Sequence, residues 1–352
     1  MIIKSALKNY SVEVIDSFSE NMKKFHSDNT YYVVDDKVYN LYRNNFDFIP
    51  NNRLFRLESK ENNKSIDSVI EICKTMTNMP SKRNTKLVSI GGGIVQDVTG
   101  FVANVLYRGI SWTFYHSTLL AACDSCIGSK TSLNCQGFKN LLGTFYPPNE
   151  IFIDSALFKT LDEKDFLSGL GEILKFSVMQ HNKGGVDNIE RHLEPLLSRN
   201  PMTLNDFIVD SLKFKKVYIE NDEFDKNERV LLNFGHTFGH AFEVSSNFEI
   251  PHGTAVALGV VVANRISAKR YSIDANLIER IEKLVHKVVN LKLKPEMVEM
   301  PLVMSAIRKD KKQLGNGINA VLLQGDFSLK RVNDVTENEI NDAVIFLKEN
   351  FV

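Results

Sequence analysis

The first 160 residues alternate two hydrophobic patterns, one typical of strands and one typical of helices. Short β-branched runs that end at Asp or Gly indicate buried strands, and apolar residues that recur every three or four positions indicate helices. The strand-like runs are 31–38, 86–93 and 110–117, and the helical stretches are 64–79 and 94–108. Strands that alternate with helices through glycine-rich connections predict a parallel α/β domain.

From residue 161 onward the helical period dominates the chain. The helical stretches are 162–180, 203–222, 254–273, 277–291 and 337–351, and AVLLQG (320–325) is the clearest late strand. This pattern predicts a second domain that is mostly helical. Because no internal repeat or low-complexity linker separates the two halves, we expect the domains to pack closely around a cleft.

Composition and charge exclude several classes of protein. The chain has 352 residues, of which 43% are hydrophobic and 24% charged, with 43 Lys and Arg against 43 Asp and Glu. A net charge of zero gives no electrostatic reason to expect nucleic acid or a membrane as the main partner. The sequence has no signal-peptide pattern, no apolar run that could span a membrane and only four cysteines. We therefore expect a cytoplasmic, reduced protein.

Three consecutive glycines stand where a predicted strand meets a predicted helix, in SIGGGIVQD (89–97). Glycine lets backbone amides approach a phosphate, and the N-terminus of a helix favours negative charge. The spacing GGGxxxD differs from the dinucleotide fingerprint GxGxxG. On the local sequence, nucleotide binding and a tight strand-to-helix turn both remain open.

Lysines and an asparagine fall in a predicted loop, DSCIGSKTSLNCQGFKNLLGTFYPP (124–148). Lys130, Lys139 and Asn140 offer positive charge and amide donors that suit phosphate or carboxylate, although a solvated surface loop is the simpler interpretation. Cys123 and Cys126 form one CxxC pair without a second. Structural thiols are therefore favoured over a redox or zinc site.

Glu172 and Lys175, in SGLGEILKF (168–176), lie three residues apart on one face of a predicted helix. An exposed ion pair of this kind stabilises a helix by only about 0.2–0.5 kcal/mol. The flanking residues are apolar, however. The alternative is a partly buried carboxylate, which needs a cation or a metal.

Three histidines lie close together: His236 and His240 in LLNFGHTFGHAFE (231–243), and His252 in IPHGTAVALG. Two histidines four residues apart on a helix can bind one zinc ion. Catalytic zinc is often held by two histidines and one carboxylate with one position open, and Glu172 is a candidate for the carboxylate. The spacing does not decide which two histidines bind.

Taken together, these stretches resemble the 3-dehydroquinate synthase family, within the sugar phosphate cyclase superfamily. The matching segments, in order, are GGGIVQDVTGF, LYRGI, STLLAACDSCIGSKTSLN, KNLLGTFYPP, SGLGEILK, DEFDKNERVLLNFGHTFGHAFE, HGTAVALG and RKDKK. The resemblance implies a Rossmann-like NAD-binding α/β domain over residues 1–160. It also implies a mostly α-helical metal- and substrate-binding domain over 161–352, with a divalent metal, zinc or cobalt, between the two.

The resemblance further implies roles for individual residues. The implied metal ligands are Glu172, His236 and His252. The implied cofactor-binding residues are Glu61, Lys64, Gly92, Gly93, Ile94, Asp97, Ser117, Thr118, Asp124, Lys139 and Thr160. The implied catalytic and substrate-binding residues are Lys130, Asn140, Lys175, Lys215, Arg229, Asn233, His240 and Lys312, with His240 contacting phosphate. Arg108 matches an arginine that reaches the site of the partner subunit in a homodimer.

The implied reaction converts a 3-deoxy-heptulosonate 7-phosphate into a carbocycle with loss of phosphate, a step of the shikimate pathway. NAD oxidises C5, phosphate leaves, the hydride returns and an aldol step closes the ring, so that NAD is not consumed. The sequence departs from the family pattern at Ser129, Phe138 and Thr254 and at His116-Ser117-Thr118. A related cyclase acting on sedoheptulose 7-phosphate or glucose 6-phosphate therefore stays an alternative. A metal-dependent NAD alcohol dehydrogenase is a second alternative, which the many lysines disfavour.

Overall fold

The computed structural model describes residues 1–78, 82–290, 293–309 and 317–351, which fold into two compact units. Unit 1 consists of Met1–Leu161 and Ile219–Phe224, and unit 2 consists of Asp162–Tyr218 and Asp225–Val352. The short second segment joins unit 1 through Glu223, whose carboxylate accepts hydrogen bonds from the hydroxyls of Ser5 at 2.6 Å and Ser129 at 2.8 Å.

Unit 1 is built on a seven-stranded sheet with the strand order β1-β2-β9-β6-β5-β3-β4. All neighbouring strands are parallel except the pair β1–β2. The strands are β1 (Ile2–Ile3), β2 (Tyr10–Val14), β3 (Thr30–Asp35), β4 (Leu54–Leu57), β5 (Lys86–Gly91), β6 (Ser111–His116) and β9 (Glu150–Ile153). The helices are α1 (Phe18–Phe25), α2 (Asp36–Leu41), α3 (Ile66–Thr77) and α4 (Gly93–Val105).

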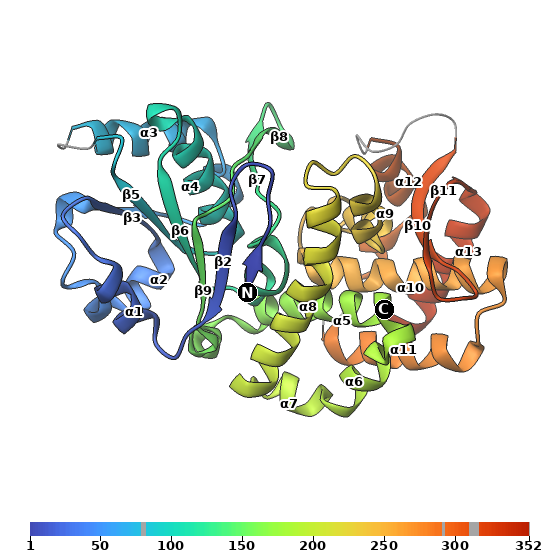
Figure 1. The fold of residues 1–352 in the computed structure, drawn as a ribbon. Helices are drawn as coiled ribbons and strands as arrows, with labels where there is room; N and C mark the ends of the chain where they lie inside the picture. Colours follow the sequence, from blue (N-terminus) through green and yellow to red (C-terminus); the bar gives the residue numbers. More distant parts are fainter. Residues whose placement is uncertain (79–81, 291–292, 310–316, 352) are drawn as a thin grey trace. The chain divides into compact units, whose positions relative to one another are not determined.

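Helices cover both faces of this sheet (Figure 1). Phe18 of α1 and Val38 of α2 bury their side chains with Tyr32 and Val88 on one face. On the other face, α4 lies so close that a β-carbon at Gly100 would come 3.1 Å from the indole of Trp112. Buried strands between two helical layers are the arrangement that the near-continuous apolar runs predicted.

The strand predicted over 31–38 is too long by three residues. β3 ends at Asp35, because its carboxylate accepts a hydrogen bond from the Lys37 amide and caps α2. Aspartate is a favoured helix N-cap, and its local hydrogen bond outweighs the strand preference of the residues that follow it.

The predicted loop 124–148 is also wrong over most of its length. Lys130–Cys135 and Phe138–Phe145 form the antiparallel strands β7 and β8. They are joined by Gln136 (φ 50°) and Gly137 (φ 80°), and two central residues with positive φ make the tight turn that suits a hairpin. Lys130, Lys139 and Asn140 therefore lie on strands.

Unit 2 is mostly helical, as the sequence predicted, and the two-part fold class is confirmed by the structure. Its helices are α5 (Glu163–Met179), α6 (Gly185–Arg191), α7 (Leu193–Leu197), α8 (Pro201–Asn221, whose last turn belongs to unit 1), α9 (His236–Ser245), α10 (His252–Tyr271), α11 (Ala275–Val288), α12 (Met300–Lys309) and α13 (Glu337–Phe351). The strands β10 (Ile318–Leu323) and β11 (Leu329–Val335) form an antiparallel pair, of which the sequence predicted only the first.

Helix α10 packs against α5 and α9 through glycine. A β-carbon at Gly171 of α5 would overlap the carbonyl oxygen of Gly253, and one at Gly259 would overlap the carbonyl oxygen of Gly235, which precedes α9. The missing side chains let the three backbones approach closely. This packing brings residues from three separate helices to one place in unit 2.

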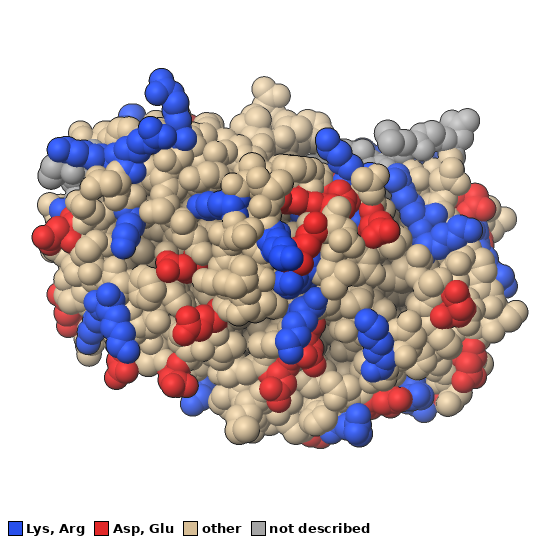
Figure 2. Space-filling view, in the orientation of Figure 1, with Lys and Arg blue, Asp and Glu red and all other residues tan. Residues whose placement is uncertain are grey.

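Charged side chains of both signs are interspersed on the face drawn in Figure 2. This distribution agrees with the balance of 43 basic and 43 acidic residues. Among the helices that the structure describes, none combines the length and the apolar character needed to cross a bilayer.

Candidate active site

Four metal-binding side chains converge where α5, α9 and α10 meet. Oε1 of the fully buried Glu172 lies 3.2 Å from Nε2 of His252 and 3.7 Å from Nε2 of His236. His240 joins them, because one nitrogen from each of the three histidines lies within 4.8 Å of the others. The predicted set Glu172–His236–His252 and a three-histidine set are thus both close enough to hold one ion.

The orientation of two histidines suits metal binding. His252 places Nδ1 3.0 Å from a carboxylate oxygen of Glu243, and His236 places Nδ1 3.1 Å from the carbonyl oxygen of Phe234. An acceptor at Nδ1 keeps a proton on that nitrogen, so a metal that displaces the proton of Nε2 would bind at Nε2. In both rings Nε2 is the atom that faces Glu172.

Sequence reasoning missed Glu243. It lies seven residues after His236 and three after His240, so it shares a helix face with both, and this spacing was the available signal. Burial lowers the pKa of His252, but hydrogen bonds and charges from Glu172 and Glu243 outweigh it and raise the pKa to about 10. The pocket thus carries enough negative charge to stabilise a cation.

The chemistry of these donors fits a divalent metal. Two histidines and one carboxylate are a common catalytic zinc set. Each oxygen of Glu172 faces a nitrogen, with Lys175 Nζ 2.6 Å from Oε2 and His252 Nε2 3.2 Å from Oε1. Burial raises the pKa of Glu172, but Lys175 and His252 outweigh burial and hold the pKa below its ordinary value. The carboxylate is therefore ionised and available to a cation.

The cationic residues predicted for unit 2 are buried. Lys175 on α5, Lys215 on α8 and Arg229 are at most 7% exposed, which is rare for such side chains. Asn233, on the turn just before α9, donates its side-chain amide to the carbonyl oxygen of Val230. Buried cations suit an anionic ligand, because ammonium and guanidinium groups give strong, directed hydrogen bonds to phosphate and carboxylate. Lys312 lies outside the described residues.

In unit 1, the glycine turn leads from the carboxyl end of β5 into α4. Gly92 caps α4, and a β-carbon there would come 2.9 Å from Thr118, just after β6. A β-carbon at Gly93 would meet nothing nearer than the Ser125 hydroxyl at 3.9 Å. The N-terminal backbone amides of α4 therefore face a small open space at Gly93, which we call the cradle. Such a cradle fits the pyrophosphate of a dinucleotide.

A polar network connects several predicted residues of unit 1. Lys64 Nζ lies 2.5 Å from Asp97 Oδ2 and donates to Asn140 Oδ1 at 2.6 Å. Ser132, which sequence reasoning missed, lies 2.9 Å from the same Asp97 oxygen and 2.8 Å from the same Asn140 oxygen. Two residues expected at the cofactor, Lys64 and Asp97, thus meet one expected at the substrate, Asn140.

A second group ties the β7–β8 hairpin to the segment after β4. Asn134 of β7 donates to the Glu61 carboxylate at 2.8 Å, and Lys139 of β8 lies 3.7 Å from that carboxylate. Glu61 and Lys139 were both expected at the cofactor, whereas nothing in the sequence marked Asn134.

The remaining predicted residues of unit 1 are more dispersed. Ile94 lies in the first turn of α4, Ser117 donates its amide to the carbonyl oxygen of Gly91, and Asp124 lies in the π-helical turn Ala121–Ser125. The Thr160 hydroxyl is 2.8 Å from that of Tyr42. Lys130 begins β7 with an exposed side chain.

Arg108 is exposed and lies in an unusual backbone segment. Tyr107, Arg108 and Gly109 have φ values of 52°, 63° and 113°, all in the left-handed region. Consecutive non-glycine residues rarely adopt this conformation, because the β-carbon clashes with the backbone. The strained turn presents Arg108 at the surface of unit 1.

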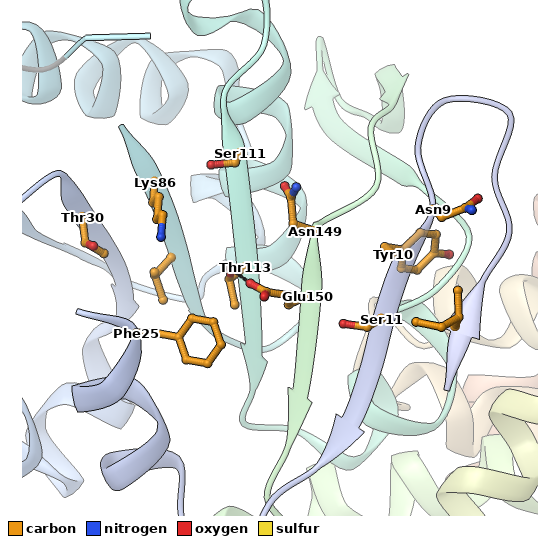
Figure 3. A pocket seen from close by; sticks show the side chains of 12 residues that line it. Asn9, Tyr10, Ser11, Phe25, Thr30, Lys86, Ser111, Thr113, Asn149 and Glu150 are labelled. Carbon is orange, nitrogen blue, oxygen red and sulfur yellow. Dashed lines mark hydrogen bonds between the residues drawn. The ribbon is translucent and has the colours of Figure 1, made fainter. Parts of the chain in front are cut away.

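A cavity of about 470 Å³ lies elsewhere in unit 1 (Figure 3). Thr30, Lys86, Ser111 and Glu150, which line it, are the first residues of β3, β5, β6 and β9. Ligands of open parallel sheets bind at the carboxyl ends of the strands, where the glycine turn lies. This cavity is therefore at the wrong edge for the cofactor, and no predicted site residue lines it.

The chain is similar to known proteins along most of its length. Two family models match adjacent parts of the chain: 3-dehydroquinate synthase N-terminal over residues 54–168 and 3-dehydroquinate synthase C-terminal over 169–313. A 3-dehydroquinate synthase of Clostridium tetani is 37% identical over 89% of this chain and 84% of its own. One of Dictyoglomus turgidum is 35% identical over 86% of this chain and 83% of its own.

Solved structures share the fold. The 2-epi-5-epi-valiolone synthase of Streptomyces hygroscopicus, with NAD+ and Zn2+ bound, has a TM-score of 0.87 and 24% identity over 98% of this chain and 99% of its own. A 2-deoxy-scyllo-inosose synthase complexed with carbaglucose-6-phosphate, NAD+ and Co2+ has a TM-score of 0.86 and 22% identity over 98% of both chains. An iron-containing alcohol dehydrogenase, with a TM-score of 0.64 and 15% identity over 95% of this chain and 96% of its own, is less similar.

Proposed function

Because the chain belongs to the 3-dehydroquinate synthase family, we propose that it converts 3-deoxy-D-arabino-heptulosonate 7-phosphate into 3-dehydroquinate. Membership of this family confirms the resemblance inferred from the sequence motifs. The reaction would make the protein a phosphate-eliminating carbon–oxygen lyase. The observation that carries the proposal is the cluster of Glu172, His236 and His252 beside the buried Lys175, which provides metal donors and a cation in one place.

The proposed cofactors are NAD and one divalent cation, zinc or cobalt. When bound, NAD supplies a reversible hydride acceptor and the cation a Lewis acid. The open cradle at Gly93 and the amide end of α4 support dinucleotide binding by residues 1–160. The fixed Nε2 orientation of His236 and His252 supports metal binding by residues 161–352.

The proposed roles of the other residues in unit 2 follow from their charge and burial. His240 and the buried cations Lys175, Lys215 and Arg229 would hold the phosphate and carboxylate of the substrate, because anions leave water only for directed donors. Asn233 would supply a neutral donor to the same substrate. These residues position the substrate and stabilise the departing phosphate.

The proposed roles in unit 1 divide between cofactor and substrate. Lys64, Asp97, Lys139 and Glu61 would contact the cofactor, and Asn140 would reach the substrate; their hydrogen bonds to the hairpin support a common binding region in this unit. The others proposed for the cofactor are Gly92, Ile94, Ser117, Thr118, Asp124 and Thr160, and Lys130 is proposed for the substrate. We also propose a homodimer in which the exposed Arg108 acts in the site of the partner subunit.

A related sugar phosphate cyclase is the second candidate. Its support is the fold similarity to 2-epi-5-epi-valiolone synthase and 2-deoxy-scyllo-inosose synthase, whose TM-scores of 0.87 and 0.86 exceed that of the dehydrogenase. These enzymes would share the metal cluster and the glycine turn and differ in the substrate they accept.

Phosphate release from a panel of sugar phosphates tests these candidates. The protein is incubated with zinc, a trace of NAD and 3-deoxy-D-arabino-heptulosonate 7-phosphate, sedoheptulose 7-phosphate or glucose 6-phosphate. The proposal expects phosphate and a carbocycle from the first substrate in large molar excess over NAD, without lasting NADH absorbance. Release from another substrate alone would favour the second candidate. Stoichiometric NADH with phosphate still attached would refute both.

A further inference from the structure

Gln96 lies in the first turn of α4, and both the nitrogen and the oxygen of its side-chain amide form hydrogen bonds with Ser125. Nε2 donates to the Ser125 carbonyl oxygen at 2.8 Å, and the Ser125 hydroxyl donates to Oε1 at 2.8 Å. Gln96 is only 4% exposed and Ser125 is partly buried, so both bonds are partly shielded from water. Buried amides are costly unless their hydrogen bonds are made, and here one residue makes them reciprocally. We call this pair the Gln96–Ser125 clamp.

The clamp holds an unusual piece of backbone. Ser125 is the last residue of the π-helical turn Ala121–Ser125. The chain enters this turn shortly after the end of β6. π-helical turns are rare, and they occur frequently at functional sites. Asp124 lies in this turn next to Ser125, so the position of its carboxylate depends on how the turn is held.

The clamp also lies directly behind the glycine turn. The backbone amide of Gln96 donates a hydrogen bond to the Gly92 carbonyl oxygen at 3.0 Å. A β-carbon at Gly93 would be 3.9 Å from the Ser125 hydroxyl. The two bonds to Ser125 thus fix the separation between the amide end of α4 and the π-helical turn.

The order of the strands decides which half of a dinucleotide meets the π-helical turn. A dinucleotide crosses the glycine turn with its pyrophosphate, and its two halves extend over the neighbouring strands. On one side of β5 lie β3 and β4, after which come Glu61 and Lys64, expected at the adenosine ribose. On the other side lies β6, followed by Asp124. The nicotinamide half would therefore meet the turn that Gln96 holds.

We propose that Gln96 is a positioning residue for the nicotinamide half of NAD and acts through Ser125 on the turn that carries Asp124. The inference rests on the proposed function, because it requires NAD as the cofactor. Without the clamp, the π-helical turn loses these two hydrogen bonds to α4, while Gly92 and Gly93 keep their own conformation. Binding of the nicotinamide half weakens, and binding of the adenosine and pyrophosphate is retained.

The test compares NAD+ with ADP-ribose, which lacks nicotinamide, by isothermal titration calorimetry on the full chain. Gln96→Met keeps the volume of the side chain and removes both hydrogen bonds. Two bonds in the lower part of the ordinary net range, about 0.7 kcal/mol each, correspond to about tenfold in a dissociation constant. We expect Gln96→Met to weaken NAD+ binding about tenfold and ADP-ribose binding less than about twofold. If the variant binds both ligands with equally weakened affinity, or binds both as tightly as the wild type, the inference is overturned.

Ser125→Ala removes only the hydroxyl bond and provides a second variant. It should weaken NAD+ binding by a smaller factor, and the double variant should bind no worse than Gln96→Met, because the two residues act through the same contact. If Gln96→Met lacks a cooperative thermal transition, Ser125→Ala alone decides, and an unchanged NAD+ affinity refutes the clamp. A wild-type protein that binds neither ligand overturns the proposed function as well. Wild-type binding without the selective loss overturns only the role of Gln96.

Discussion

Replacing Glu243 tests how the histidines of the proposed metal site are held. Its carboxylate lies 3.0 Å from Nδ1 of His252, and no other acceptor among the described residues contacts that nitrogen. Glu243→Ala removes the acceptor, so the ring is free to rotate or to carry its proton on Nε2. Either change lowers the fraction of protein in which Nε2 is ready to bind a cation.

The magnitude follows from the kind of hydrogen bond. A hydrogen bond to a charged group contributes about 1.5–3 kcal/mol. Because 1.4 kcal/mol corresponds to a factor of ten in a dissociation constant, the zinc affinity should fall between about tenfold and about 100-fold. Glu243→Gln keeps an oxygen acceptor without the charge and should lie near the lower end. The side chain is 13% exposed, so water replaces it poorly.

Zinc affinity is measured by competition with a chromophoric chelator, independently of turnover. Glu249→Gln is the matched control, because Glu249 also lies in unit 2 but is 58% exposed and pairs with Lys294 at 3.1 Å. The control should bind zinc like the wild type. Unchanged affinity in Glu243→Ala, or an equal loss in the control, would refute the orienting role of Glu243.

Three further outcomes are expected. His252→Ala should lose zinc, whereas His240→Ala should keep zinc and weaken substrate binding. Metal content and KM measure these two effects. Loss of zinc from a folded His240→Ala variant would favour the three-histidine set as the metal ligands. Gly259→Ala should destabilise the protein by roughly 1–3 kcal/mol, because its β-carbon would overlap the carbonyl oxygen of Gly235, and an unchanged urea midpoint would contradict this. Burial lowers the pKa of Lys8 to about 8 from its ordinary value of 10.5, so the unfolded chain holds this proton more tightly. The stability of the wild type relative to Lys8→Met should thus be lowest below pH 8 and rise from pH 8 to 10.5, and a flat difference in urea titrations would refute it.

The periodic parts of the fold could be predicted from the sequence, and the half-exposed parts could not. Helix α10 carries a long apolar repeat and was expected within a few residues of its bounds. The hairpin β7–β8 was missed, because β8 is exposed over most of its length and its lysine, asparagine and glycine residues are typical of loops. Its tight turn at Gln136 and Gly137 has no Asn-Gly or Asp-Gly signal.

The candidate site also has a part that could be predicted from the sequence and a part that could not. The three clustered histidines and the candidate carboxylate Glu172 could be found from the residues directly, and the resemblance chose His236 and His252 over His240 as the implied ligands. Contacts between distant positions could not be found. Lys64 and Asn140 are 76 residues apart, and they meet only because the hairpin folds back over the segment after β4.

The placement of Ile219–Phe224 in unit 1 has a consequence for synthesis of the chain. The ribosome completes Leu161 well before it reaches Ile219, and at about 5–20 residues per second the delay is roughly 3–12 seconds. During that interval the hydroxyls of Ser5 and Ser129 lack the Glu223 carboxylate that joins them in the finished protein. The nascent N-terminal unit is thus incomplete until all of α8 and Glu223 after it have been made, and a fragment cut at residue 161 would remain in that unfinished state.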